Sequence, residues 1–263
     1  MGLAARLRRS VVARNTAWIT LGQGGRTVLQ AAYFIVIART LGPGGYGAFV
    51  GAAALSALAA PFAGLGAGNV LIQYVARDHR AFARYWGGAL AVTVSGGLLS
   101  VGVVVLAARA VLPSTIPTVL VACVAVSDLL FATVLYLCGQ AYQAVERMQR
   151  TAQLPIVTTA LRLLAAALFV ALPSEHSPAR WGVYYLACTA LSTAVALWLT
   201  TRELGRPVMA FTYRTTELRE GFYFATGISA QNVYNDIDKT MLSRMSTLDA
   251  TGIYGAAYRI IDV

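Results

Sequence analysis

The sequence predicts an all-α protein that crosses a membrane many times as a helical bundle. Of its 263 residues, 57% are apolar and only 12% are charged, whereas a soluble domain carries about 25% charged residues. The apolar residues also form long runs, and each of the first seven has about the twenty residues that a membrane-crossing helix needs. The runs lie at 16–38, 47–68, 87–111, 118–140, 154–172, 181–200 and 221–243, and an eighth begins at 252.

The first run follows a basic segment, as in a secretory signal peptide, but it is too long for one and no clear cleavage site follows it. We therefore expect it to be an uncleaved first membrane helix. The connection Arg39–Gly47 contains Pro43 and four glycines, which predicts a tight turn into the second helix.

The distribution of arginine in the loops predicts the orientation of the chain, because cytoplasmic loops are enriched in basic residues. With a cytoplasmic N-terminus, thirteen loop arginines lie on the cytoplasmic side and four on the outer side. The thirteen are Arg6, Arg8, Arg9, Arg14, Arg77, Arg80, Arg84, Arg147, Arg150, Arg202, Arg206, Arg214 and Arg219, and the four are Arg39, Arg109, Arg180 and Arg244. We expect a multi-pass protein of the bacterial inner membrane with its N-terminus in the cytoplasm.

The formal net charge of +10 would suggest nucleic-acid binding in a soluble protein. Within the predicted spans, however, four cations are balanced by four acids, so the excess lies in the loops. Its role there is topology and contact with anionic lipid headgroups, and we expect membrane lipids and no nucleic acid as partners. In one such loop, Gln73–Trp86, apolar and basic residues fall on different faces, which predicts a helix lying in the membrane interface.

Ionisable residues inside apolar spans are the strongest functional signal, because each costs about 2.5–3.5 kcal/mol near the membrane centre. In the first span Gln23, Arg26 and Gln30 share one helical face, which favours a hydrated cavity over a buried ion pair. Asp128 in the fourth span is as consistent with a buried pair with Arg26 or Arg162 as with ion coupling. Arg162 lies on a short polar stripe of the fifth span, which is equally consistent with cavity lining and with a buried structural role, and it is a further candidate for cavity or substrate contact.

The seventh and eighth spans, Gly221–Val263, carry the densest polar set. A broad polar face in the seventh span cannot face lipid, and the alternative to a cavity is local pairing of Asp236 with Lys239 and of Arg259 with Asp262. The candidates for cavity or substrate contact here are Asn232, Asn235, Asp236, Asp238, Lys239 and Arg259, and Asp262 joins Asp128 as a candidate for coupling or a structural ion pair.

We find no spacing typical of a catalytic triad, a metal site or a phosphate-binding loop. The two histidines, His79 and His176, lie in separate polar connections. The sequence therefore predicts no catalytic residues, no metal and no cofactor, and we do not expect an enzyme.

A short internal echo suggests a repeat. Tyr46-Gly47-Ala48 follows the first turn and Tyr254-Gly255-Ala256 follows the turn after the seventh span. Their matching places predict that the seventh and eighth helices begin a second copy of the first two.

These two regions carry a resemblance to a known family. Arg39–Phe49 (RTLGPGGYGAF) and Asp238–Ile260 (DKTMLSRMSTLDATGIYGAAYRI) resemble the polysaccharide-transporter, or Wzx-type oligosaccharide flippase, family. That family belongs to the multidrug/oligosaccharidyl-lipid/polysaccharide exporter superfamily. The resemblance implies twelve to fourteen helices in two lobes around a central cavity.

On that resemblance, 1–205 is an N-terminal six-helix lobe, 206–220 a cytoplasmic linker and 221–263 the start of a C-terminal lobe. The chain ends within its eighth helix, so we expect a two-lobe exporter fold truncated there.

The resemblance further implies a flippase that moves undecaprenyl-pyrophosphate-linked oligosaccharide from the cytoplasmic to the outer leaflet. Arg26 and Arg162 would then meet the pyrophosphate, while Asp236, Asp238 and the asparagines would bind sugar or carry a coupling proton or cation. The open alternatives are a multidrug/cation antiporter, a lipid II flippase and, less favoured, a membrane glycan polymerase or ligase.

Overall fold

The computed structural model describes residues 3–172, 175–208 and 215–261, and for residues 3–19, 21–22, 215 and 259–261 it describes the backbone alone. Across these residues it is helical nearly throughout and contains no strand. This confirms the predicted all-α fold. The helices are α1 (Leu3–Gly64), α2 (Ala67–Arg77), η1 (His79–Ala81), α3 (Phe82–Val111), α4 (Thr118–Ala125), η2 (Val126–Ala132), α5 (Thr133–Ala144), α6 (Met148–Ala171), α7 (Pro178–Leu204), α8 (Thr215–Met245) and α9 (Leu248–Ile261).

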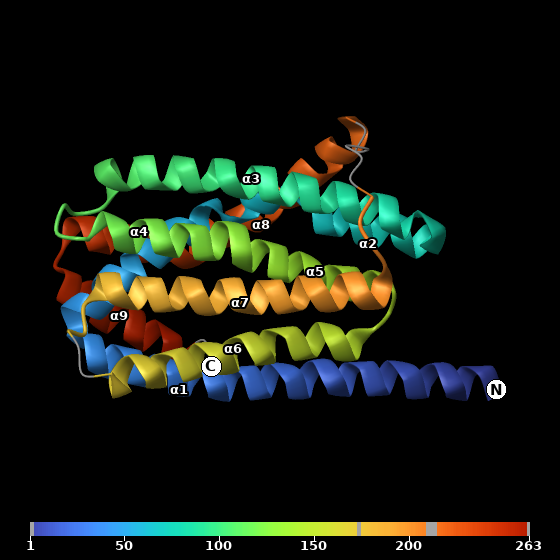
Figure 1. Ribbon diagram of the computed structural model, residues 1–263, viewed down its shortest axis with the longest axis horizontal. Coiled ribbons are helices and arrows are strands. Elements are labelled where there is room, and N and C mark those ends of the chain that lie inside the picture. Colours follow the sequence, from blue (N-terminus) through green and yellow to red (C-terminus); the bar gives the residue numbers. More distant parts are fainter. Residues whose placement is uncertain (1–2, 173–174, 209–214, 262–263) are drawn as a thin grey trace.

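The long helices run side by side as an antiparallel bundle (Figure 1). Within the part of the chain that the structure describes, five helical stretches are long and apolar enough to cross a membrane: Gln23–Arg77, His79–Val111, Thr118–Ala144, Met148–Ala171 and Pro178–Leu204. The first is 55 residues long, more than twice what one crossing needs. It contains both the first and the second predicted spans, so these stretches account for six of the predicted helices.

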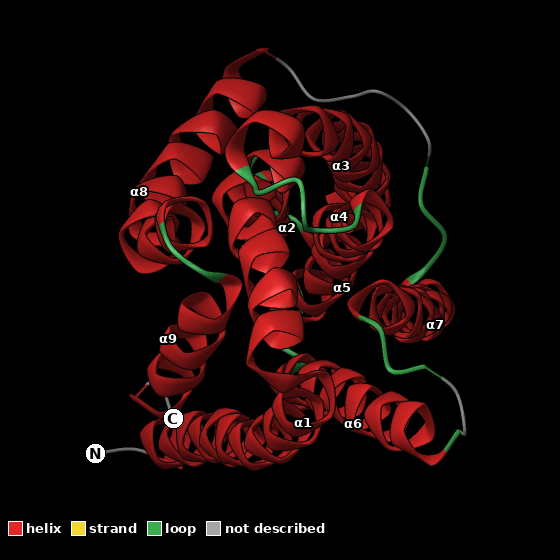
Figure 2. Ribbon diagram, turned by 90° about the vertical axis from the view of Figure 1, so that its left-hand side faces the viewer, coloured by secondary structure: helices red, strands yellow, loops and turns green. Residues whose placement is uncertain are grey.

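The α1 helix is in fact two helices that meet at a kink. Gly42 has φ 69° and ψ 174°, a left-handed φ that favours glycine, and Pro43 at once restarts the helix. The two halves diverge from this point and enclose an angle that α8 and α9 fill (Figures 1 and 2). The expected tight turn is therefore present, but it is shorter than Arg39–Gly47.

The predicted interfacial helix at Gln73–Trp86 is wrong. The segment is a sharp reversal between two bundle helices, with Asp78 in extended conformation between α2 and the short η1 helix. Val75, Phe82 and Trp86 are buried in the bundle rather than in lipid. The apolar and basic residues of this segment do lie on different sides, because the arginines are exposed. The apolar residues, however, contact other helices of the protein.

The α8 helix differs from the predicted seventh span in two respects. It begins at Thr215, six residues before the predicted start at Gly221, and it is too polar to count among the helices apolar enough to cross a membrane. Along with α9, it packs against α1. The turn after α8 is tighter than the sequence predicts, since α9 already begins at Leu248 rather than at 252.

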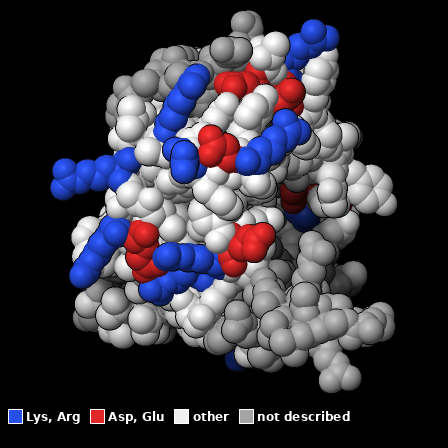
Figure 3. All heavy atoms as spheres, turned by 90° about the vertical axis from the view of Figure 1, so that its right-hand side faces the viewer, with Lys and Arg blue, Asp and Glu red and all other residues white. Residues whose placement is uncertain are grey.

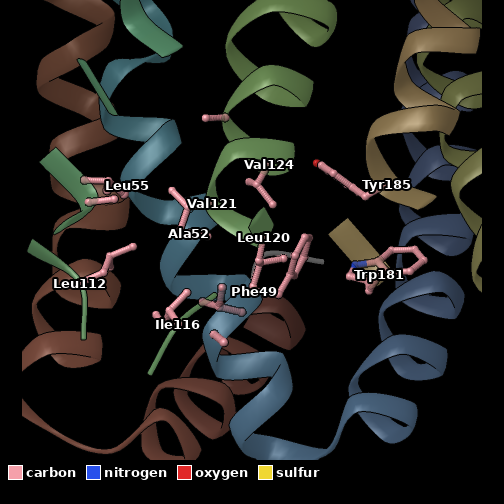
Figure 4. Packing of buried hydrophobic residues seen from close by; sticks show 14 of the residues in the cluster. Phe49, Ala52, Leu55, Leu112, Ile116, Leu120, Val121, Val124, Trp181 and Tyr185 are labelled. Carbon is pink, nitrogen blue, oxygen red and sulfur yellow. The ribbon is translucent and has the colours of Figure 1, made fainter. Parts of the chain in front are cut away.

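Aromatic packing fixes α1 against α7. The Phe49 ring meets the Tyr185 ring edge-on, with centroids 5.3 Å apart, and the Trp181 ring at 6.3 Å. Edge-to-face pairs of this kind add to the stabilisation from burial. Figure 4 shows Leu120 of α4 next to Phe49, with Trp181 and Tyr185 on the other side of the cluster, so this cluster joins three segments of the chain directly beside the polar residues described below.

Charged side chains gather at one end of the bundle, where the α2–α3 turn, the α5–α6 turn and the end of α7 lie (Figures 1 and 3). Glu203 accepts from Arg150 at 2.5 Å and from Arg147 at 3.4 Å. Arg77, Arg80 and Arg84 are exposed at the same end. This grouping follows the loops that the arginine distribution predicts to be cytoplasmic.

Candidate functional site

A polar cavity of about 410 Å³ lies between the two halves of α1 and helices α6, α7, α8 and α9, with η2 contributing one residue. Its volume is within the range of small-molecule sites in proteins. The lining residues are Arg26, Gln30, Tyr33, Phe34, Tyr46, Phe49, Val50, Ala53, Ala54, Ala57, Asp128, Thr159, Arg162, Tyr185, Asn235, Asp236, Lys239, Gly255 and Tyr258.

The first charged cluster of the cavity joins Asp128, Arg162 and Tyr185. The Tyr185 hydroxyl donates to Oδ1 of Asp128 at 2.8 Å, and the guanidinium carbon of Arg162 lies 4.4 Å from the centre of the Tyr185 ring. A guanidinium nitrogen of Arg162 is 3.9 Å from the same Asp128 oxygen and donates to Thr189 at 3.3 Å. The arginine is thus held by a ring, a hydroxyl and a carboxylate at once.

Local backbone geometry places Asp128 in this cluster. It lies in η2, a π-helical segment within the otherwise α-helical fourth span, and such segments are frequent at functional sites. The widened turn is supported by two threonine hydroxyls, Thr133 donating to the Asp128 carbonyl at 3.1 Å and Thr193 of α7 to the Phe131 carbonyl at 2.9 Å. These bonds tie the position of Asp128 to α7.

The second charged cluster lies on α8 and α9. The ammonium of Lys239 donates to Asp236 at 2.8 Å and to the carbonyl oxygen of Asn235 at 2.7 Å, and it lies 4.3 Å from the centre of the Tyr258 ring. The local Asp236–Lys239 pairing considered from the sequence is therefore present. Pairing and cavity lining are not exclusive, because both residues also line the cavity.

The cavity lies near mid-depth of the apolar helices. Asp128 is about 15 Å along the helix axis from Thr118, and Arg162 is about 14 Å from Ala171, at 1.5 Å per residue. A bilayer core is about 30 Å thick. Both residues are therefore far from bulk water on either side, and the cavity provides the polar surroundings that such charges require.

Seven of the twelve sequence-predicted site residues line this one cavity. They are Arg26, Gln30, Asp128, Arg162, Asn235, Asp236 and Lys239. Of the two partners that the sequence leaves open for Asp128, Arg162 lies near it, with the 3.9 Å separation given above.

Of the other five predicted site residues, three do not line the cavity and two have side chains that the structure does not describe. Gln23 is exposed, Asn232 donates its amide to the Ala57 carbonyl at 3.0 Å, and Asp238 accepts from the Tyr254 hydroxyl. Arg259 lies in α9 with its side chain outside the described atoms, and Asp262 lies outside the described residues.

Sequence reasoning missed most of the aromatic wall. Tyr46, Phe49, Tyr185 and Tyr258 line the cavity, yet an aromatic residue in an apolar run is usually a core residue. Nothing in the sequence distinguishes Tyr185 from its neighbour Tyr184. Only the pairing of α7 with η2 and α6 shows that Tyr185 meets the charged residues.

The described lining residues comprise three cations and two acids, together with amide, hydroxyl and tyrosine side chains. This set can bind an anionic group through arginine and lysine, and it can donate to and accept from hydroxyl groups. Among the described residues, no group of three or more His, Cys, Asp and Glu side chains is arranged to hold a metal ion.

Comparisons with known proteins give one solved structure and one family. The structure, of a protein named "protein A", superposes with a TM-score of 0.74 at 14% sequence identity, covering 96% of this chain and 60% of that one. The likeness shows a shared fold, and this chain spans 60% of the length of the protein it matches. No curated protein matches.

The family comparison covers nearly the whole chain. A model described as "Polysaccharide biosynthesis protein" matches residues 12–263. The match includes every helix that lines the cavity and both of the regions, Arg39–Phe49 and Asp238–Ile260, whose residues suggested such a family. The chain belongs to the polysaccharide biosynthesis protein family.

Proposed function

We propose that the protein is a flippase that carries undecaprenyl-pyrophosphate-linked oligosaccharide from the cytoplasmic to the outer leaflet of the bacterial inner membrane. The observation that carries this proposal is the mid-depth polar cavity with cations on two of its walls. A sugar–pyrophosphate headgroup cannot cross hydrocarbon unaided, because its phosphates and hydroxyl groups would lose their hydration. Membership of the polysaccharide biosynthesis family supports a membrane protein that transports a polysaccharide precursor rather than a catalyst.

In this function, different cavity residues would bind different parts of the headgroup. Arg26 and Arg162 would meet the pyrophosphate, because guanidinium groups donate two parallel hydrogen bonds to phosphate. Asn235 and Asp236 would bond sugar hydroxyls on the α8 wall. The lipid tail would remain in the bilayer while the headgroup occupies the cavity, and closure of the cavity on alternate sides would move the headgroup across.

Coupling to a proton or cation belongs to the same proposal. Asp128 and Asp236 are carboxylates at the cavity surface, each beside a cation. An anionic headgroup that takes over the cation leaves its carboxylate in need of a new counter-charge, which a proton or metal cation supplies.

A multidrug or cation antiporter is the second candidate. The same two carboxylates and the tyrosine rings of the cavity would suit an organic cation. The net excess of cations among the described lining residues favours an anionic substrate instead. A lipid II flippase would use the same headgroup chemistry and differs only in the glycan.

The decisive test is transbilayer movement. The full-length protein would be reconstituted in liposomes with fluorescent lipid-pyrophosphate oligosaccharide, and the outer-leaflet fraction would be measured by enzymatic or chemical quenching. We expect protein-dependent movement, and we expect loss of surface glycan in a deletion strain that the wild-type gene restores. Arg26→Ala and Arg162→Ala are expected to abolish both, with Arg77→Ala at the exposed α2–α3 turn as the matched control.

Three results would contradict the proposal. Movement of a cationic dye without movement of the lipid-linked glycan would favour the antiporter. Lengthening of the glycan in the absence of movement would favour the polymerase. Full activity of both arginine variants at normal expression would remove Arg26 and Arg162 from the site.

A further inference from the structure

Tyr185 contacts both members of the Asp128–Arg162 pair, each through a different part of its side chain. Its hydroxyl donates to Oδ1 of Asp128 at 2.8 Å, and its ring lies under the guanidinium of Arg162 at 4.4 Å. The guanidinium approaches the same Oδ1 only to 3.9 Å. That separation exceeds hydrogen-bonding distance, so the pair attracts electrostatically without a direct hydrogen bond.

An arginine beside an aspartate ordinarily forms a two-point hydrogen-bonded pair, because the guanidinium and the carboxylate match in geometry. Such a pair would consume two guanidinium donors. Here the tyrosine hydroxyl bonds one carboxylate oxygen, Oδ1, and Thr189 accepts from one guanidinium nitrogen at 3.3 Å. The Arg162 side chain lines the cavity and is 23% exposed, so its terminal nitrogens, rather than the buried Nε, provide the donors that remain for a ligand.

We propose that Tyr185 is a positioning residue that holds Asp128 away from Arg162 and thereby keeps the guanidinium available for an acidic group of the substrate. The proposal rests on the proposed function for the identity of that group, a phosphate of the lipid-linked headgroup. The Tyr185 ring supports the Arg162 guanidinium, while the Tyr185 hydroxyl restrains the Asp128 carboxylate, which would otherwise compete with the substrate for that guanidinium. An anion entering the cavity then meets a cation that is already oriented and not yet committed to a carboxylate.

The second cluster provides the contrast. Lys239 also lies over a tyrosine ring, that of Tyr258, at 4.3 Å. Its carboxylate partner Asp236 is in direct contact at 2.8 Å, and within the described residues no hydroxyl hydrogen bond of Tyr258 lies between them. The two tyrosines therefore share the ring–cation contact and differ in the carboxylate bond. The control for Tyr185→Phe is Tyr184→Phe, because Tyr184 precedes Tyr185 in α7, packs against Phe169 and is not among the residues that line the cavity.

The test measures binding of inorganic pyrophosphate to the full-length protein in detergent by isothermal titration calorimetry. We expect Tyr185→Phe to weaken binding about tenfold, a factor equivalent to about 1.4 kcal/mol, because Asp128 then closes on Arg162. Tyr184→Phe is expected to bind like the wild type, because Tyr184 is not among the residues that line the cavity. Asp128→Asn is expected to bind at least as tightly as the wild type.

The double variant separates positioning from a general structural effect. Without a carboxylate at position 128 there is no competitor, so Tyr185→Phe combined with Asp128→Asn should recover wild-type binding. A merely structural role of the hydroxyl would give a double variant as weak as, or weaker than, Tyr185→Phe. If Tyr185→Phe does not fold, loss of binding in Asp128→Asn alone would still overturn the proposal.

Three further outcomes would overturn it: unchanged binding in Tyr185→Phe, equal weakening in Tyr184→Phe, or no saturable binding by the wild type. Failure of the proposed function is distinguishable, because it appears as absence of glycan movement by the wild-type protein in liposomes. Glycan movement with unaltered pyrophosphate binding in Tyr185→Phe would contradict the role of Tyr185 and leave the flippase proposal intact.

Discussion

Gly47 and Leu248 are in such close contact that a Cβ on Gly47 would lie 1.8 Å from the Leu248 carbonyl oxygen. The contact is mirrored by Gly252, where a Cβ would lie 2.1 Å from the Pro43 carbonyl oxygen. The kink of α1 and the start of α9 thus meet backbone to backbone. This contact brings together the two regions that the sequence shows as an internal echo, and it lies at one end of the cavity walls.

Replacing Gly47 by alanine is therefore expected to separate these elements. Overpacking of a buried site costs about 1–3 kcal/mol, and here the obstacle is backbone, which cannot rotate away. We expect Gly47→Ala to lower the apparent melting temperature in detergent, measured by size-exclusion chromatography after heating. Gly102→Ala is the matched control, because a Cβ at Gly102 of α3 would meet nothing within 4 Å. Equal melting temperatures for both variants would show that the helices move apart freely.

The π-helical segment around Asp128 should depend on Thr193. Its hydroxyl lies 2.9 Å from the part-buried Phe131 carbonyl and 2.8 Å from the Thr189 carbonyl of its own helix, and loss of a hydrogen bond of this kind costs about 0.5–1.5 kcal/mol. We expect Thr193→Val to lower thermal stability and to reduce glycan export, because Asp128 loses its connection to α7. Thr158→Val is the control, since the Thr158 hydroxyl donates only to the Leu154 carbonyl of its own helix turn. Export by Thr193→Val equal to that of Thr158→Val would contradict this role.

Much of the fold was predictable because one physical requirement dominates a membrane helix, namely a run of apolar residues about twenty long. The first six spans follow from it. The predictions that failed concern apolar side chains that contact other helices of the protein rather than lipid. Trp86 is fully buried within the bundle, which an apolar stripe in the sequence cannot distinguish from burial in the membrane interface.

The charged half of the site was predictable for a similar reason, since a charge at mid-depth needs partners. Arg162 and Lys239 were identified in this way. The tyrosines of the site were not predictable, because aromatic residues are common at lipid-facing, core and cavity positions alike. The π-helical turn at Asp128 was equally hidden, since Val126–Ala132 has the composition of any apolar helix and its geometry depends on threonines from two different helices.

The N-terminus of α8 should depend on a hydrogen bond to α3. The Tyr85 hydroxyl donates to Glu217 at 2.9 Å, and Glu217 is only 4% exposed. A hydrogen bond to a charged group contributes about 1.5–3 kcal/mol. We expect Tyr85→Phe to increase amide hydrogen exchange in the first turns of α8, measured by mass spectrometry.

Tyr223→Phe provides the comparison for that experiment. The Tyr223 hydroxyl accepts from Arg219 at 3.0 Å at an exposed site within α8, where such a bond contributes little. Hydrogen exchange in Tyr223→Phe should match the wild type. Equal protection of α8 in Tyr85→Phe and Tyr223→Phe would show that α8 is held by packing alone.

The orientation of the bundle can be tested with single cysteines in a variant whose three natural cysteines are replaced by alanine. Thr115 lies in the α3–α4 connection and Gln149 in the first turn of α6, at opposite ends of the bundle, and both are exposed. The end that includes Gln149 also carries Arg147 and Arg150, and basic residues favour the cytoplasmic side. In spheroplasts, a membrane-impermeant maleimide should therefore label Thr115→Cys directly and Gln149→Cys only after lysis. Labelling in the reverse order would place the N-terminus outside. The cavity would then open toward the other leaflet at each stage of the cycle, and the transport direction would have to be assigned anew.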